Sequence, residues 1–92
     1  MMNKSIKANN KDNVATTIQN LSAGERVQIE GNEFCLNQDV LSYHKFALMN
    51  IKRGEEIIKY GEAIGVASKD ILAGDLVHVH NIESVRGRGD KK

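Results

Sequence analysis

The chain has 92 residues, 40% of them hydrophobic, and its 13 basic and 12 acidic side chains leave a formal net charge of +1. A chain of this length forms one domain with a modest core and little room for an enclosed active site, because it buries only about 60% of the surface that its unfolded form exposes. The balanced charge argues against a nucleic-acid partner, since nucleic-acid binders usually carry a strongly basic face.

The first thirteen residues, MMNKSIKANNKDN, contain no apolar run of signal-peptide length. We expect residues 1–11 to be a flexible N-terminus and residues 12–84 to form the domain. Nowhere does an apolar stretch approach the length of a membrane span, so no membrane partner is expected. The single cysteine, Cys35, excludes an intrachain disulfide and fits a reducing compartment. These features predict a cytoplasmic protein.

The apolar runs of the domain are short, several alternate with period two, and none keeps a helical period of 3.6. In chain order they are VATTI, RVQIE, EFCL, HKFALM, EIIKY, AIGVA and LVHVH. Gly31-Asn32 and Gly61-Glu62 each separate two runs, which indicates two-residue hairpin turns with glycine at positive φ. Cys35 has apolar neighbours and is expected to be a small core residue. The chain is predicted to be all-β, with short strands and tight glycine turns.

One turn sequence recurs three times, as LSAGERV at 21–27, IKRGEEI at 51–57 and ILAGDLV at 71–77. Each copy follows an Asn or Asp and contains an aliphatic residue, a glycine, an acid and a final Val or Ile. The acid is expected to accept hydrogen bonds from turn amides. The unequal spacing excludes a regular solenoid, so we interpret the copies as one turn used three times in a compact fold. Residues 85–92 are expected to be a C-terminal tail or linker.

The stretch LVHVHN holds two of the three histidines of the chain. If it is a strand, Leu76, His78 and His80 share one face, and Val77 and Val79 face the core. Two imidazoles about 6–7 Å apart at the backbone can reach one divalent metal ion. His78 and His80 are therefore candidate metal ligands that need further ligands from elsewhere. The alternative is that they are exposed or hydrogen-bonded structural histidines.

Two further stretches carry candidates for catalysis and substrate binding. His44 and Lys45 begin the run HKFALM, where they can bind a carboxylate or transfer a proton, or are simply solvated. Lys59 and Tyr60 precede the Gly61 turn. The lysine offers a point charge for a carboxylate, and the tyrosine offers a packing surface or a hydroxyl donor.

Four motifs follow one another between residues 44 and 84. They are His44-Lys45, Ala47-Leu48, the hairpin IIKYGEAIG at 57–65, and His78-Val79-His80-Asn81. This ordered combination resembles the N-terminal domain of the altronate and galactarate dehydratase family, and the resemblance extends over about residues 12–90. One departure is Tyr43, where many members have glycine.

The resemblance implies a small β-clip fold of the SAF type. It also implies an N-terminal domain or small subunit of a sugar-acid dehydratase, which eliminates water from altronate to give 2-keto-3-deoxygluconate. The complete enzyme would contain a divalent iron or manganese ion and a large catalytic domain or subunit, while the isolated chain would be inactive and need hold no metal. The alternatives are a small subunit of a sulfolactate sulfo-lyase, or a non-catalytic carbohydrate-binding or lid module.

The candidate site residues fall into three groups by expected role. Those expected in catalysis are His44, Lys45 and Lys59, those expected to bind the sugar-acid substrate are Lys59, Tyr60 and Asn81, and those expected to bind metal are His78 and His80.

Overall fold

The computed structural model describes residues 4–84, which form nine short strands. In chain order they are β1 (Ser5–Ile6), β2 (Val14–Thr17), β3 (Arg26–Ile29), β4 (Asn32–Cys35), β5 (Lys45–Ala47), β6 (Glu56–Lys59), β7 (Glu62–Ala67), β8 (Leu76–Val77) and β9 (Ile82–Ser84). The predicted all-β class with short strands is confirmed. Within the described residues there is no helix long and apolar enough to cross a membrane.

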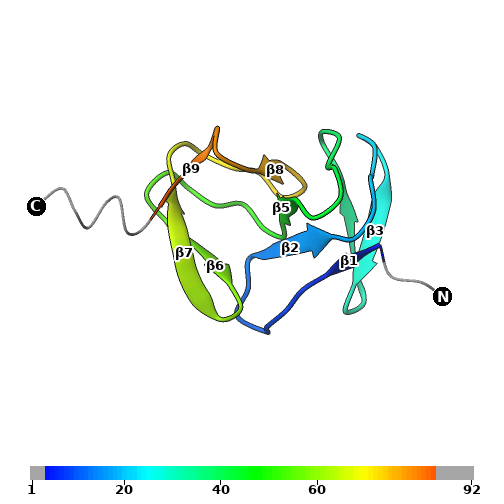
Figure 1. Cartoon of the computed structure of the whole chain (residues 1–92), viewed down its shortest axis with the longest axis horizontal. Helices are drawn as coiled ribbons and strands as arrows, with labels where there is room; N and C mark the ends of the chain where they lie inside the picture. The colour runs from blue at the N-terminus through cyan, green and yellow to red at the C-terminus, as the bar shows by residue number, and fades with distance from the viewer. Residues whose placement is uncertain (1–3, 85–92) are drawn as a thin grey trace, which may run out of the picture.

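The strands form three antiparallel sheets, with β1-β2-β5-β8 as the central sheet, β3-β4 at one end and β6-β7-β9 at the other (Figure 1). Strand alternation gives the central sheet a core on each face. Val14 and Ala47 are opposite each other and join the cluster beneath β6 and β7, while Ala15 and Phe46 join the cluster beneath β3 and β4. Polar side chains of this sheet therefore reach the surface mainly at the strand ends.

Both hairpins turn one residue earlier than predicted. The turn residues are Glu30-Gly31 and Tyr60-Gly61, and all four have positive φ. A two-residue turn of this type requires positive φ at both positions, because its twist must match that of the flanking strands. The glycine therefore occupies the second turn position, and Tyr60 belongs to the turn.

The folded region begins earlier than the predicted boundary at residue 12. Ser5 pairs with Thr17 and Ile6 with Thr16, so β1 forms an edge of the central sheet within the segment expected to be flexible. The amide of Ile18 also donates to the carbonyl of Lys4. The predicted tail at 85–92 lies outside the described residues.

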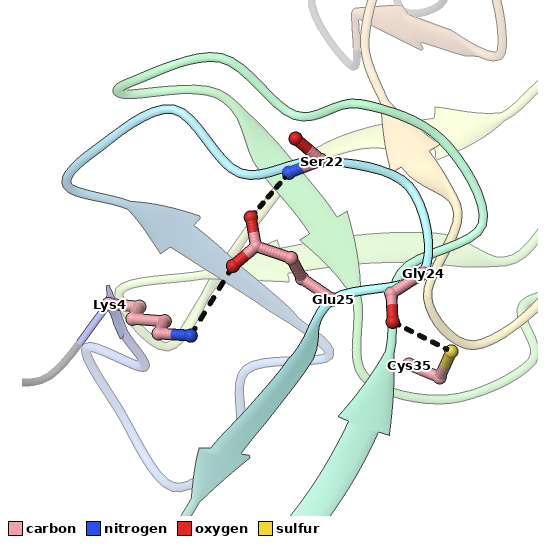
Figure 2. Close-up of polar contacts among 5 residues, drawn as sticks. All are labelled: Lys4, Ser22, Gly24, Glu25 and Cys35. Atoms are coloured by element: carbon pink, nitrogen blue, oxygen red, sulfur yellow. Dashed lines mark hydrogen bonds and ion pairs between the residues drawn. The ribbon is translucent and has the colours of Figure 1, made fainter.

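The predicted role of the turn acids is confirmed in all three copies. The carboxylates of Glu25, Glu55 and Asp75 accept hydrogen bonds from the amides of Ser22, Lys52 and Leu72 at 2.7–2.9 Å. Figure 2 shows the first copy, in which the carboxylate of Glu25 lies between the Ser22 amide and the ammonium of Lys4. These two donors hold the pKa of Glu25 below its ordinary value.

Cys35 is exposed, and its expected place in the core is wrong. Alternation along β4 turns Phe34 toward the core, where it packs against the cluster containing Phe46. The next side chain must then face outward, and the sulfur of Cys35 lies 3.9 Å from the carbonyl oxygen of Gly24 (Figure 2).

Candidate functional site

The site begins with a fourth copy of the repeated turn, formed by the sequence DVLSYHKF at 39–46. Val40 forms an isolated antiparallel β-bridge with Leu21, as Ile51 does with Ile71. The four polar residues that precede the copies each accept a hydrogen bond from an amide of the paired copy. The donor and acceptor pairs are Ala23 to Asp39, Ser42 to Asn20, Arg53 to Asp70 and Ala73 to Asn50.

In the fourth copy Tyr43 takes the glycine position and His44 takes the position of the acid. Tyr43 has a φ of 67°, and its amide donates to Thr17 as the amide of Gly24 donates to Leu36. Sequence comparison missed this copy because both signature residues are replaced. The remaining signal was the Asp39-Val40 pair at the usual distance from the turn.

At the acid position of the turn, the imidazole of His44 makes a hydrogen bond within the turn, as the acids do in the other copies. Its Nδ1 lies 3.0 Å from the carbonyl oxygen of Ser42. A carbonyl oxygen can only accept, so Nδ1 carries a hydrogen, and the tautomer compatible with this bond has its lone pair at Nε2. The turn thus holds His44 in the tautomer that accepts a proton at Nε2.

Tyr43 also provides a test of the shared turn geometry. Replacing Tyr43 with glycine should raise the free energy of unfolding by up to about 1 kcal/mol, because left-handed backbone is strained for a residue with a Cβ atom. Urea unfolding of the full chain measures the change. The matched control is Gly54→Ala, at a φ of 90°, which should lower stability. A loss of stability in Tyr43→Gly would contradict the equivalence of the two positions.

His78 lies beyond the end of β8, and the predicted strand through residue 80 is wrong. Residues 78–81 form a turn, in which the amide of Asn81 donates to the carbonyl of His78 at 3.0 Å. The side chain of Asn81 closes this turn, since its Oδ1 accepts from the amide of His78 and its Nδ2 donates to the carbonyl of Leu76. Val79 is consequently 78% exposed instead of facing the core.

The turn pairs His78 with His44 rather than with His80. Lys45 pairs with Val77 across β5 and β8, so His44 and His78 flank the same end of the two strands. Their ring centroids are 4.8 Å apart, with the ring planes at 53°. His80 is exposed and lines a separate cavity with Gln38 and Asp75. The expected face shared by His78 and His80 is not formed.

The side chain of Asn81 is buried within the turn at 78–81. It is 4% exposed, and both ends of its amide bind the backbone of the turn. The side chain thus has a structural role, which is to close the turn that places His78 beside His44. The substrate contact of Asn81 stays a prediction.

The lysines Lys45 and Lys59 complete the group, which we call the basic cluster: His44, Lys45, Lys59 and His78. Burial lowers the pKa of Lys45, and the charge of Lys59 lowers it further. Burial also lowers the pKa of His78, with additional effects of His44, Lys45 and, last, His80. Neither lysine forms an ion pair within residues 4–84, and the ammonium of Lys59 lies 5.0 Å from the centroid of the Tyr60 ring. The cluster is suited to an anion.

Removing the charge of Lys45 should raise the pKa of His78 toward its ordinary value of about 6.5, because a neighbouring positive charge disfavours the imidazolium. The rise should be partial, since burial remains the largest cause of the lowering. An NMR pH titration of the His78 ring protons in Lys45→Met measures it. The exposed Lys52 gives the matched control, and an equal response to Lys52→Met would contradict the proximity of Lys45.

A metal centre does not fit the described residues by themselves. Among residues 4–84 no group of three or more His, Cys, Asp or Glu side chains is placed to hold a metal ion. His44 and His78 have rings in contact, but the positive charges of Lys45 and Lys59 disfavour a metal cation beside them. The arrangement therefore favours a carboxylate over a metal.

Comparison with known proteins agrees with the motifs at 44–84. Residues 3–85 match the family described as the altronate/galactarate dehydratase SAF domain. The chain is 46% identical to altronate dehydratase of Escherichia coli (strain K12) over 83% of this chain and 15% of that protein. It is 39% identical to altronate dehydratase of Bacillus subtilis (strain 168) over 90% of this chain and 17% of that protein.

A shorter relative is also matched. The chain is 42% identical to the (2R)-sulfolactate sulfo-lyase subunit alpha of Paracoccus pantotrophus, over 52% of this chain and 72% of that protein. The chain thus spans about one-sixth of the altronate dehydratases and most of the sulfo-lyase subunit.

Proposed function

The chain belongs to the family of altronate/galactarate dehydratase SAF domains, and on that premise we propose that it serves a dehydratase acting on altronate. Its basic cluster binds the carboxylate of the sugar acid at a site completed by a large catalytic part. The observation that carries this proposal is the convergence of His44, Lys45 and His78 with Lys59, without an acidic partner for either lysine within residues 4–84.

The reaction needs functions that these residue types supply. Dehydration of a 2,3-dihydroxy acid removes the proton beside the carboxylate, develops negative charge on that carboxylate, and protonates or otherwise stabilises the departing hydroxide. Lys45 and Lys59 neutralise the carboxylate, and the fixed Nε2 of His44 accepts or returns a proton. Partial burial strengthens these interactions relative to those in bulk water.

The cluster lies at the surface of a small domain, so the remaining catalytic groups come from elsewhere. The relatives named altronate dehydratase are about six times longer than the matched region. We assign the divalent iron or manganese ion of the complete enzyme to that larger part, where it would stabilise the leaving hydroxide when bound. The isolated chain is expected to be inactive.

A sulfo-lyase is the second candidate, and the match to a subunit that is itself short favours it. Sulfolactate also carries a carboxylate, so the basic cluster is compatible with both substrates. The greater coverage of this chain by the altronate dehydratases supports altronate as the first candidate.

An assay of the chain assembled with its large catalytic part tests the proposal. Altronate should yield a 2-keto-3-deoxy acid, and (2R)-sulfolactate should yield no sulfite. Release of sulfite without dehydration of altronate would replace the first candidate by the second. Activity of the large part that is independent of this chain would contradict both and favour a binding or lid module.

A further inference from the structure

A cavity of about 220 Å³ borders the basic cluster, and most of its lining lies outside that cluster. Its apolar lining residues include Ile6, Val14 and Ile18, and Tyr43 and Tyr60 also line it. It is joined to the cluster because Lys59 lines it directly. Thr16, another lining residue, is opposite Lys45 in the central sheet, so its side chain lies on the same face.

Three large side chains around this cavity are unusually exposed for their type. Tyr43 is 76% exposed, Tyr60 67% and Ile6 52%. Both tyrosines have positive φ, at 67° and 57°, a conformation that strains residues with a Cβ atom. Exposed apolar residues gathered around a concavity mark an interaction surface, and tyrosine is enriched among the residues that dominate interface energies.

The size and chemistry of the cavity favour an apolar side chain over the sugar acid as its occupant. Small-molecule sites usually begin at roughly 300 Å³, above the volume found here. A polyol also needs a polar partner for each hydroxyl, whereas this lining is mainly apolar. The carboxylate of Asp12 is already used by the amides of Asn9, Tyr60 and Gly61.

We infer that the cavity receives an aromatic or branched aliphatic side chain of the large catalytic part, and so docks that part beside the basic cluster. The relatives show how much chain has to be accommodated, because this chain matches only 15% and 17% of their lengths. Docking at this cavity would place residues of the large catalytic part next to Lys45 and Lys59, where the proposed substrate site needs further groups. The inference rests on the proposed function only in taking the large catalytic part as the partner.

The test measures the affinity of the full chain for the large catalytic part, produced as a separate polypeptide. Ile18→Asp puts a charge into the cavity and should weaken assembly at least about tenfold. Ile64→Asp is the matched control, since Ile64 is equally exposed at 37% but lies outside the cavity. Tyr43→Gly is the second variant, which relieves backbone strain while removing a lining side chain, and it should weaken assembly without loss of stability.

The outcomes separate the docking surface from the substrate site. Unchanged assembly in both Ile18→Asp and Tyr43→Gly would overturn the inference, and the proposed function would still stand if Lys45→Met raised KM for altronate. A raised KM in Ile18→Asp with unchanged assembly would make the cavity a substrate site. A dimer of the chain alone that Ile18→Asp dissociates would make a second copy the occupant, which also overturns the inference.

Discussion

Replacing His44 with alanine in the assembled enzyme is expected to lower kcat on altronate by roughly 100- to 10,000-fold, the range typical for loss of a general acid or base. The turn around Ser42 fixes the tautomer of His44 and presents Nε2 for proton transfer. The imidazole makes no other side-chain hydrogen bond within the described residues, so the fold should survive its removal. Steady-state kinetics with altronate, together with thermal unfolding of the variant, measure both effects.

His80 is the matched control for this prediction. His80 is exposed and lines a cavity that contains no residue of the basic cluster. His80→Ala should therefore change kcat by less than about threefold, well under the range for a general acid or base. Equal losses in the two variants would contradict the pairing of His44 with His78 and restore the pairing of His78 with His80.

Replacing Asp12 with alanine should lower the free energy of unfolding by about 3 kcal/mol, because three backbone amides then lose their shared carboxylate acceptor. Asp12 is 2% exposed, and its carboxylate accepts from the amides of Asn9, Tyr60 and Gly61 at 2.8–3.1 Å. Urea unfolding of the full chain measures the loss. Asp12 thereby ties the tip of the β6–β7 hairpin to the segment before β2.

Asp39→Ala is the comparison for this second prediction. The carboxylate of Asp39 accepts one hydrogen bond, from the amide of Ala23, and the residue is exposed. Its loss should cost about 1 kcal/mol or less. If Asp12→Ala were no more destabilising than Asp39→Ala, the structural role of the buried carboxylate would be wrong.

Much of the fold could be predicted from the sequence because it depends on local rules. Alternating apolar residues predicted most strands, and glycine followed by an acid predicted three turns whose acids bind their own amides. The predicted hairpin turns were one residue too late, because the pattern shows a glycine without showing which of the two turn positions it occupies.

The candidate site could be predicted less well, because it depends on contacts between residues that are far apart in the sequence. His44, Lys45, Lys59 and His78 were all proposed from sequence, but their grouping was not. A strand through His80 was the simplest interpretation of LVHVHN, but β8 ends at Val77 and a turn closed by Asn81 follows it. The role of Asp12 depends on amides 48 and 49 residues away, which no local pattern reveals.

The most direct test of the basic cluster is the KM for altronate of the assembled enzyme carrying Lys45→Met and Lys59→Met together. Loss of two charged contacts with the carboxylate should raise KM by about 100-fold. The fold should be retained, because burial disfavours the charged form of Lys45. Lys52→Met, at an exposed turn position, should leave KM unchanged. An unchanged KM in the double variant would contradict the assignment of the basic cluster to the substrate carboxylate.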